Sequence, residues 1–324
     1  MPDATEQAIV TYGELARLER DFDDVELEII RQQYTLAKPL YEKREKLVAN
    51  IPSFWPLVME QAPQEIDQYI QPSDSAVLLS SLRSISVSHF EIENGGEGDP
   101  RSISVKLEFA ENEHFEDKVL EKKFWFRVAR NGSGGLVSEP VPIKWKAGKD
   151  LTQGLLDLAV KVWKQDKKDG HTNGASNDKK KTEPENWTAD QKALRQKIDT
   201  YGLGGVSFFC WFGYRGLDIS AEENIIGVEE QKKRRAKDDE ASELEKADED
   251  DDEEAEEDEE EYPLEIFPDG DDLAVAFSQD LWPNAIRFFV QAQEADTISD
   301  FDFEDDGENE GNDNEAPPLK KRKM

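Results

Sequence analysis

The residue types that most often carry catalysis or hold metals are scarce and scattered in this chain. The only histidines are His89, His114 and His171, and the only cysteine is Cys210. Their separations do not match the spacing of zinc or iron ligands. Cys210 stands inside an aromatic run, where a buried and unreactive thiol is expected. We therefore expect no metal site, no bound cofactor and no cysteine nucleophile.

Glycine-containing stretches resemble phosphate-binding loops only in part. In the loop that ends Ala147-Gly148-Lys149-Asp150, Ile143 stands where the first glycine would be, and Asp150 replaces the hydroxyl residue. Gly202-Leu203-Gly204-Gly205 follows no predicted strand. The many carboxylates lack the glycine-centred spacing of a calcium loop. The sequence therefore predicts a protein that is not an enzyme.

The dominant chemical feature of the sequence is its negative charge. The net charge is −34, residues 238–261 hold 18 acids and one lysine, and residues 294–315 hold 11 acids and no base. Such a chain repels DNA phosphates and anionic lipids, so we expect no strong direct DNA binding and no membrane binding. One acidic run is commonly only a solvated segment. Two runs attached to an acidic body favour a polycationic partner.

Two basic clusters oppose the acidic runs, and the sequence pattern also bears on location. The cluster Lys320, Lys321, Arg322 and Lys323 at the end of the chain is typical of a nuclear import signal that binds importin. Residues 232–237 form a candidate second signal. No apolar run approaches the length of a membrane span, and the N-terminus lacks a secretory signal pattern. We expect a nuclear protein, with shuttling to the cytoplasm left open.

A long N-terminal helix is the element around which the chain is organised. Apolar residues recur at steps of three and four, with Gln32 in one polar position, and define a narrow seam: Leu15, Leu18, Phe22, Val25, Ile29, Leu36 and Leu40. Pro39 is expected to kink the helix, and Pro52 to end it after Ile51. A helix of about 45 residues would be roughly 65–70 Å long. We expect the seam to pair with a second copy, giving a homodimer; a helix folded back on its own chain is the alternative.

The rest of the chain predicts one α+β domain over residues 52–293. Alternating apolar residues predict a four-stranded antiparallel sheet packed by helices, with strands at 83–93, 102–109, 118–129 and 136–145. A change of face near Phe90 suggests a bulge. Ser73 and Asp74 are candidate caps for a helix over 76–82, and Ser207 for the run 208–212. Late aromatics between 273 and 289 need a core, and this sheet is the one available.

Three segments are expected to lie outside the packed domain. Residues 166–186 are rich in Lys, Asp, Asn and Gly and predict a disordered insert. Residues 238–261 form the acidic insert. Residues 294–324 are expected to be an acidic disordered tail that ends in the basic cluster. The first unit, residues 1–51, is the dimerisation helix.

Five sequence blocks in this order resemble the nucleosome assembly protein family, and the match is better to its SET/template-activating-factor branch. They are Ile51-Pro52-Ser53-Phe54-Trp55 after the long helix, residues 111–120, residues 143–152, Ser207-Phe208-Phe209-Cys210-Trp211-Phe212, and Asp280-Leu281-Trp282-Pro283-Asn284. The resemblance implies a headphone-shaped homodimer, in which a long paired helix carries two α+β "earmuff" domains. It also implies a histone chaperone that binds core histones, as the tetramer-forming or the dimer-forming pair, and assembles or disassembles nucleosomes without ATP.

The resemblance also implies where histones are bound and what the competing function is. The histone-contacting acids carried over to this chain are Glu108, Glu111, Glu113, Glu116 and Asp117 beside the second and third strands, and Asp218, Glu222 and Glu223 after the Phe-rich block. The alternative is a regulatory subunit or inhibitor of a histone-modifying enzyme, an acetyltransferase, or of a phosphatase. This chain departs from the branch in that its acidic residues are split between two runs and its last residues are basic.

Overall fold

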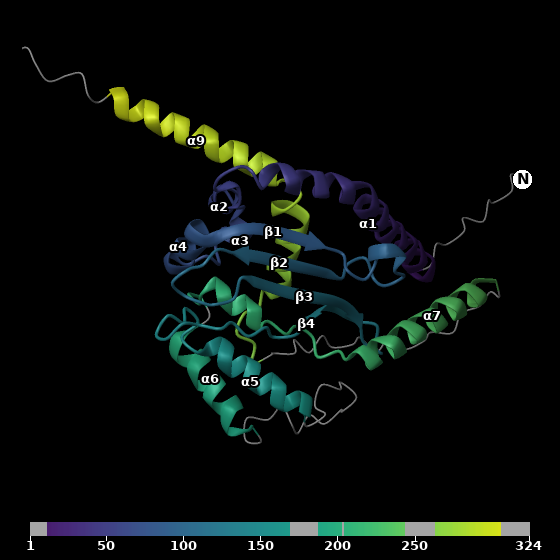
Figure 1. Ribbon diagram of the computed structural model, residues 1–324. Helices are drawn as coiled ribbons and strands as arrows, with labels where there is room; N and C mark the ends of the chain where they lie inside the picture. Colours follow the sequence, from purple (N-terminus) through teal and green to yellow (C-terminus); the bar gives the residue numbers. More distant parts are fainter. Residues whose placement is uncertain (1–11, 169–186, 203, 244–262, 306–324) are drawn as a thin grey trace, which may run out of the picture.

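The computed structural model describes residues 12–168, 187–202, 204–243 and 263–305. A four-stranded antiparallel sheet lies at the centre, α1 arches along one edge of it, and α5 and α6 lie beyond the other edge (Figure 1). In chain order the elements are α1 (Tyr12–Val48), α2 (Phe54–Glu60), α3 (Gln64–Asp67), α4 (Pro72–Ser81), β1 (Leu82–Ser88), η1 (Glu93–Gly95), β2 (Ile103–Phe109), β3 (Val119–Val128), β4 (Gly134–Ser138), α5 (Leu155–Lys168), α6 (Ala189–Tyr201), η3 (Phe208–Gly213), α7 (Ala221–Glu243), α8 (Gly270–Ala276), η4 (Phe277–Leu281) and α9 (Ala285–Asp305). None of the described helices has the length and apolar character that a membrane crossing requires.

The sheet has the predicted antiparallel order β1-β2-β3-β4, with Leu107 opposite Ile85 on one side and Leu120 on the other. Two details of the prediction are wrong. β1 ends at Ser88, so Phe90 lies beyond the strand, and the register shift falls between Leu82 and Ser84 instead. The fourth strand covers 134–138 and not 136–145, because prolines stand at 140 and 142 and a proline cannot donate a ladder hydrogen bond.

The Phe-rich segment forms the centre of the core against one face of the sheet. Ser207 caps η3 as predicted, since its Oγ accepts a hydrogen bond from the Phe209 amide at 3.1 Å. Every side chain from Phe208 to Phe212 is fully buried. The Trp211 ring stacks on Phe124 of β3 at 5.4 Å and on Phe277 of the late aromatic segment at 5.5 Å. The late aromatics therefore do pack on the sheet, and burial raises the pKa of the Cys210 thiol, which suits an unreactive core residue.

One side of β3 departs from a simple apolar pattern. Leu120, Lys122 and Phe124 point into the core, whereas Val119 is 44% exposed. The Lys122 Nζ donates to the carbonyl oxygens of Phe212 at 3.2 Å and of Tyr214 at 2.9 Å. Burial lowers the pKa of Lys122 to about 7, against the attraction of Glu265 and Glu139. This buried lysine fixes the end of η3 to the sheet.

The described residues include parts of the three outer segments. α9 continues to Asp305, so residues 294–305, predicted to belong to the disordered tail, are helical. α5 ends at Lys168, and α7 extends to Glu243, inside the acidic insert. Most of the insert 166–186, most of the acidic insert 238–261 and the import cluster 320–323 lie outside the described residues.

A single buried carboxylate, that of Asp74, joins the start of α4 to η3. Its Oδ2 accepts hydrogen bonds from the Gln71 amide at 3.0 Å and from the Phe208 amide at 2.7 Å, and its Oδ1 accepts from the Ser207 hydroxyl at 2.6 Å. Burial raises the pKa of Asp74, and these hydrogen bonds oppose that rise. The expected cap residues are therefore corrected: the N-cap is Gln71, and Asp74 is the third residue of the helix.

Replacing Asp74 by asparagine should destabilise the fold. The asparagine side chain has one acceptor oxygen, whereas its NH2 group is itself a donor. That NH2 group would face at least one of the three groups that donate to Asp74, which leaves a buried donor unsatisfied. We expect Asp74→Asn to lower the free energy of unfolding by about 2 kcal/mol, as measured by urea denaturation. The exposed Asp67 gives a matched control, because Asp67→Asn changes the same charge at the surface. Equal stability of the two variants would contradict this role for Asp74.

Candidate functional site

The inner face of α1 is attached to the domain of its own chain. Tyr34 is buried, and its hydroxyl donates to the Glu93 carboxylate at 2.7 Å, which also pairs with the Lys38 ammonium at 3.2 Å. The Arg31 guanidinium donates to the Gly98 carbonyl oxygen at 2.6 Å. These contacts hold the β1–β2 connection against the middle of α1. Burial raises the pKa of Tyr34, and the hydrogen bond from Tyr34 is the main cause that lowers the pKa of Glu93.

The end of α1 is fixed by Arg44, which lies in an aromatic cage. Its guanidinium donates to the carbonyl oxygens of Trp282 and Pro283. The carbon at its centre lies 4.9 Å from the centroid of the Tyr41 ring and 4.7 Å from that of Trp282, in cation–π geometry. Burial lowers the pKa of this arginine. Arg44 thus connects α1 to the late segment that enters α9.

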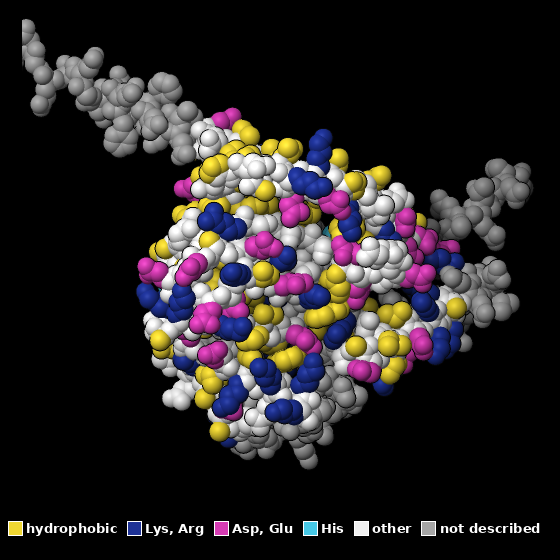
Figure 2. All heavy atoms as spheres, in the orientation of Figure 1, with side chains coloured by type: hydrophobic (Ala, Val, Ile, Leu, Met, Phe, Trp, Pro, Cys, Tyr) yellow, Lys and Arg dark blue, Asp and Glu magenta, His cyan; other side chains and the backbone are white. Residues whose placement is uncertain are grey.

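The outer face of α1 is the predicted seam, and it is exposed in the single chain. Its members are between 52% and 74% exposed: Leu15, Leu18, Phe22, Val25, Ile29, Leu36 and Leu40. Leu47 continues the same apolar surface. Hydrophobic side chains gather along the top of the view in Figure 2, over α1 and the start of α9. An exposed apolar stripe of this length is typical of an interaction surface.

The first predicted group of acids is interleaved with lysines. Residues 111–117 are joined to residues 143–149 by a β-bridge between Phe115 and Trp145. The Lys144 amide donates to the Asp117 carboxylate at 2.6 Å, and Lys149 pairs with Glu113 at 3.3 Å. Glu108 pairs with Lys106 at 2.6 Å on the outward face of the sheet. Glu111 and Glu116 are exposed. Sequence reasoning did not foresee this partial neutralisation, because the lysines at 144 and 149 follow about thirty residues later in the chain.

The second predicted group lies at the other end of the sheet. Asp218 precedes α7, and Glu222 and Glu223 occupy its first turn, where negative charge suits the helix dipole. The Asn224 side chain accepts a hydrogen bond from the Val128 amide at 2.8 Å, so α7 begins where β3 ends. Burial raises the pKa of Glu223, and Arg130 opposes that rise.

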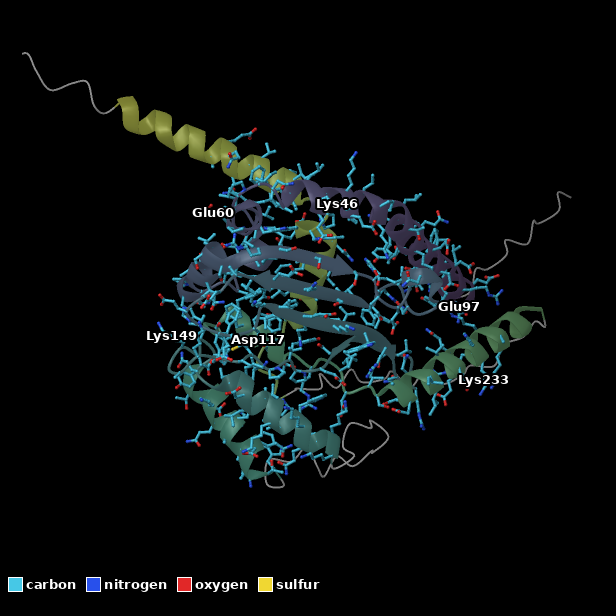
Figure 3. All side chains as sticks on the ribbon, in the orientation of Figure 1. Lys46, Glu60, Glu97, Asp117, Lys149 and Lys233 are labelled. Atoms are coloured by element: carbon cyan, nitrogen blue, oxygen red, sulfur yellow. The ribbon has the colours of Figure 1, made fainter. Side chains whose placement is uncertain are left out.

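The two groups of acids are therefore not brought together within one chain. The first group lies where β3 begins and the second where it ends, and a strand of this length spans about 30 Å. In Figure 3, Asp117 and Lys149 lie on the opposite side of the molecule from Lys233 of α7. Among the described residues, no cluster of three or more His, Cys, Asp or Glu side chains could hold a metal ion.

In the basic cluster 232–237, the two arginines contact other parts of the chain, whereas the three lysines face solvent. Arg234 donates to the backbone carbonyl of Arg130 at 2.8 Å, in the turn between β3 and β4. Arg235 donates to both oxygens of the Asp24 carboxylate on α1, each at 3.0 Å. The three lysines of the cluster are exposed. Two residues of the candidate second import signal thus attach α7 to the sheet and to α1.

Comparison with known proteins agrees with this architecture. The family model described as "Nucleosome assembly protein (NAP)" matches residues 35–292. The chain belongs to the nucleosome assembly protein family. The matched region includes Leu36 and Leu40 of the seam, and the seam residues from Leu15 to Ile29 precede it.

Individual relatives place the chain near the predicted branch. A Schizosaccharomyces pombe protein named as a nucleosome assembly protein is 37% identical over 155 residues, which are 45% of this chain and 61% of that protein. Protein SET of Drosophila melanogaster is 33% identical over 156 residues, 48% of this chain and 55% of SET. These two matches thus span less than two thirds of each relative. Vacuolar protein sorting-associated protein 75 of Saccharomyces cerevisiae is 25% identical over 96% of this chain and 94% of its own.

A crystal structure of Vps75 shows that the fold is shared. It superimposes with a TM-score of 0.51 at 22% sequence identity, covering 86% of this chain and 96% of that one. The predicted NAP-like α+β fold, with a long N-terminal helix and a four-stranded antiparallel sheet packed by helices, is therefore confirmed.

Replacing Arg44 by methionine should loosen α1 from the domain. Methionine retains much of the apolar packing but leaves the carbonyl oxygens of Trp282 and Pro283 without this donor. We expect Arg44→Met to lower the free energy of unfolding by about 2 kcal/mol and to speed amide hydrogen exchange over residues 31–48. Lys43→Met removes an exposed charge next to it and serves as the control. Unchanged exchange in the Arg44 variant would show that the cage does not hold α1.

Proposed function

We propose that this protein is a histone chaperone that binds core histones and takes part in nucleosome assembly and disassembly without ATP. The observation that carries the proposal is the family match over residues 35–292 in a chain with a net charge of −34. A family named for nucleosome assembly and a strongly acidic chain both point to a basic protein cargo. The catalytic machinery of an enzyme has no part in this proposal, and the expected location is the nucleus, where core histones are assembled.

The acidic residues act in this proposal by occupying the Lys and Arg side chains with which histones bind DNA. The described surface mixes both signs of charge on the face shown in Figure 2. The strongest concentrations of acid in the sequence are at 238–261, within the bounds of the domain, and at 294–315, after it. We propose that these runs supply many weak, salt-screened contacts, while the folded acids supply contacts of fixed geometry. DNA, which has a denser charge, then extracts the histone.

The working form in this proposal is a homodimer formed by the outer face of α1. The inner face is already used by Tyr34 and Arg44 within the chain, so the helix does not fold its seam back onto its own domain. Fully burying an apolar side chain of this size is favourable by about 1.5–3 kcal/mol, and these partly exposed side chains gain part of that, from which the entropic cost of association is subtracted. Burial of seven such side chains on one face of α1 therefore favours dimerisation with a second copy of the chain. In this proposal, residues 1–51 act as the dimerisation helix, residues 52–293 as the earmuff domain and residues 294–324 as the tail.

Charge reversal at the second group of acids tests the histone-binding face. We expect the combined variant Asp218→Lys, Glu222→Lys and Glu223→Lys to bind core histones about tenfold more weakly, because like charges then meet the basic cargo. The measurement is a fluorescence titration against the dimer-forming and the tetramer-forming histone pairs at several salt concentrations. Affinity of the unaltered chain should fall steeply as salt rises.

A matched variant separates position from net charge. Glu60, Glu65 and Asp67 are exposed acids outside both predicted groups, and reversing all three changes the net charge equally. We expect this control to lose much less affinity and both variants to keep their molar mass. Equal losses would show that only net charge matters, and a wild-type chain that ignores both histone pairs at moderate salt would overturn the proposed function.

A further inference from the structure

A cavity of about 600 Å³ lies beside the edge strand β4 and takes no part in the features described above. It is bounded by β4, by α6, by the segment that follows η3 and by residues 263–271. Its size falls within the range of ligand-binding pockets in proteins. The space accommodates a long side chain together with some of the backbone that carries it.

Part of the cavity wall is apolar, and the adjacent strand β4 contributes small residues, among them Gly135. Leu136, Ile198 and Leu217 line it, together with the ring of Tyr214. Gly135 belongs to β4 beside the cavity, and a Cβ atom there would lie 2.8 Å from the Leu217 side chain. A larger residue at this position would therefore press Leu217 out of its place.

Two carboxylates give the cavity its polar end. Glu265 is only 9% exposed, and each of its oxygens accepts two backbone hydrogen bonds. One oxygen accepts from the amides of Arg215 at 2.8 Å and Gly216 at 3.4 Å, and the other from those of Ile266 at 2.8 Å and Phe267 at 3.1 Å. Asp271 lies in the first turn of α8 and lines the same cavity. Burial raises the pKa of both carboxylates. Backbone hydrogen bonds and the charge of Lys122 oppose that rise at Glu265, and backbone hydrogen bonds with the Tyr214 hydroxyl oppose it at Asp271.

The described cations near the cavity already have partners. Arg195, on its rim, pairs with Asp199 at 3.0 Å and donates to the Pro263 carbonyl oxygen at 3.1 Å. Lys122 does not line the cavity; its ammonium donates to backbone carbonyl oxygens in the core and attracts the Glu265 carboxylate. A cation that entered from outside would therefore meet an apolar wall and the carboxylate of Asp271, which has no described basic residue among the causes of its pKa shift.

We propose that this cavity binds one lysine or arginine side chain of a basic peptide segment, an inference that rests on the proposed function and names an anchor point for its cargo. The aliphatic stem lies along Leu136, Ile198 and Leu217, and the charged end reaches Asp271 beside the Tyr214 ring. A purely apolar side chain would not use the negative charge of Asp271, and a compact metal ion would leave the apolar walls unfilled. The acidic run of the sequence ends at Glu261, directly before Tyr262 and the cavity-lining Pro263.

A pair of neighbouring aspartates makes the test specific. Asp271 lines the cavity and Asp272 is exposed beside it, so Asp271→Asn and Asp272→Asn change the net charge equally. The probe is a synthetic peptide of alternating lysine and serine, titrated against the full chain by fluorescence anisotropy. We expect Asp271→Asn to weaken binding about tenfold and Asp272→Asn to change it little, because only Asp271 forms the charge-assisted contact. Equal affinity of the two variants would overturn the proposal.

Two further measurements keep the test independent of folding. Leu217→Trp fills the cavity without changing charge and should weaken peptide binding to a similar degree, with the thermal unfolding temperature as the check on folding. In the unaltered chain, the peptide should slow amide exchange at 134–136 and 263–271, and unchanged exchange there would contradict the site. Core-histone affinity that is the same for the wild-type chain and for Asp271→Asn would refute the cavity alone, whereas a wild-type chain that binds no histone would refute the proposed function.

Discussion

The α1 helix has two faces with different roles: one packs on the domain of its own chain and the other is left exposed for a second chain. The rest of the structure depends on that constraint. On its inner face, Tyr34 and Arg44 connect it to the β1–β2 region and to the segment that leads into α9. On its outer face, a row of large apolar side chains has no cover within the described part of the chain. Because the inner contacts fix the orientation of the helix, they also fix the direction in which the seam faces. A second copy that covers the seam would thereby place two domains in a defined relation.

Inside the domain, a few buried polar groups decide how the aromatic core is oriented. Asp74 holds the start of η3, and Lys122 holds its end through the carbonyl oxygens of Phe212 and Tyr214. Between these two points, the side chains of Phe208 to Phe212 form an aromatic cluster that packs against Phe124 and Phe277. Buried polar groups of this kind stabilise only when every partner is in place. They give the apolar segment one register against the sheet.

The sequence predicted those features that depend on local periodicity. The seam from Leu15 to Leu40 and the strand Ile103–Phe109 follow directly from spacing, and the cap at Ser207 from local chemistry. Features that depend on distant neighbours were not predicted. Nothing near Lys122 in the sequence indicates that carbonyl groups some ninety residues later will surround it. Likewise, the sequence around Glu113 and Asp117 does not indicate that the fold places Lys149 and Lys144 beside them.

The central claim is that the outer face of α1 joins two chains, and the molar mass in solution tests it most directly. Sedimentation equilibrium of the full chain at micromolar concentration should give twice the chain mass of 36.9 kDa. The combined variant Leu18→Ser, Val25→Ser and Ile29→Ser should give the mass of one chain and keep the wild-type circular dichroism of the domain, since these side chains are exposed within the single chain. A wild-type chain that sediments as a single copy, or a seam variant that remains a dimer, would contradict the account.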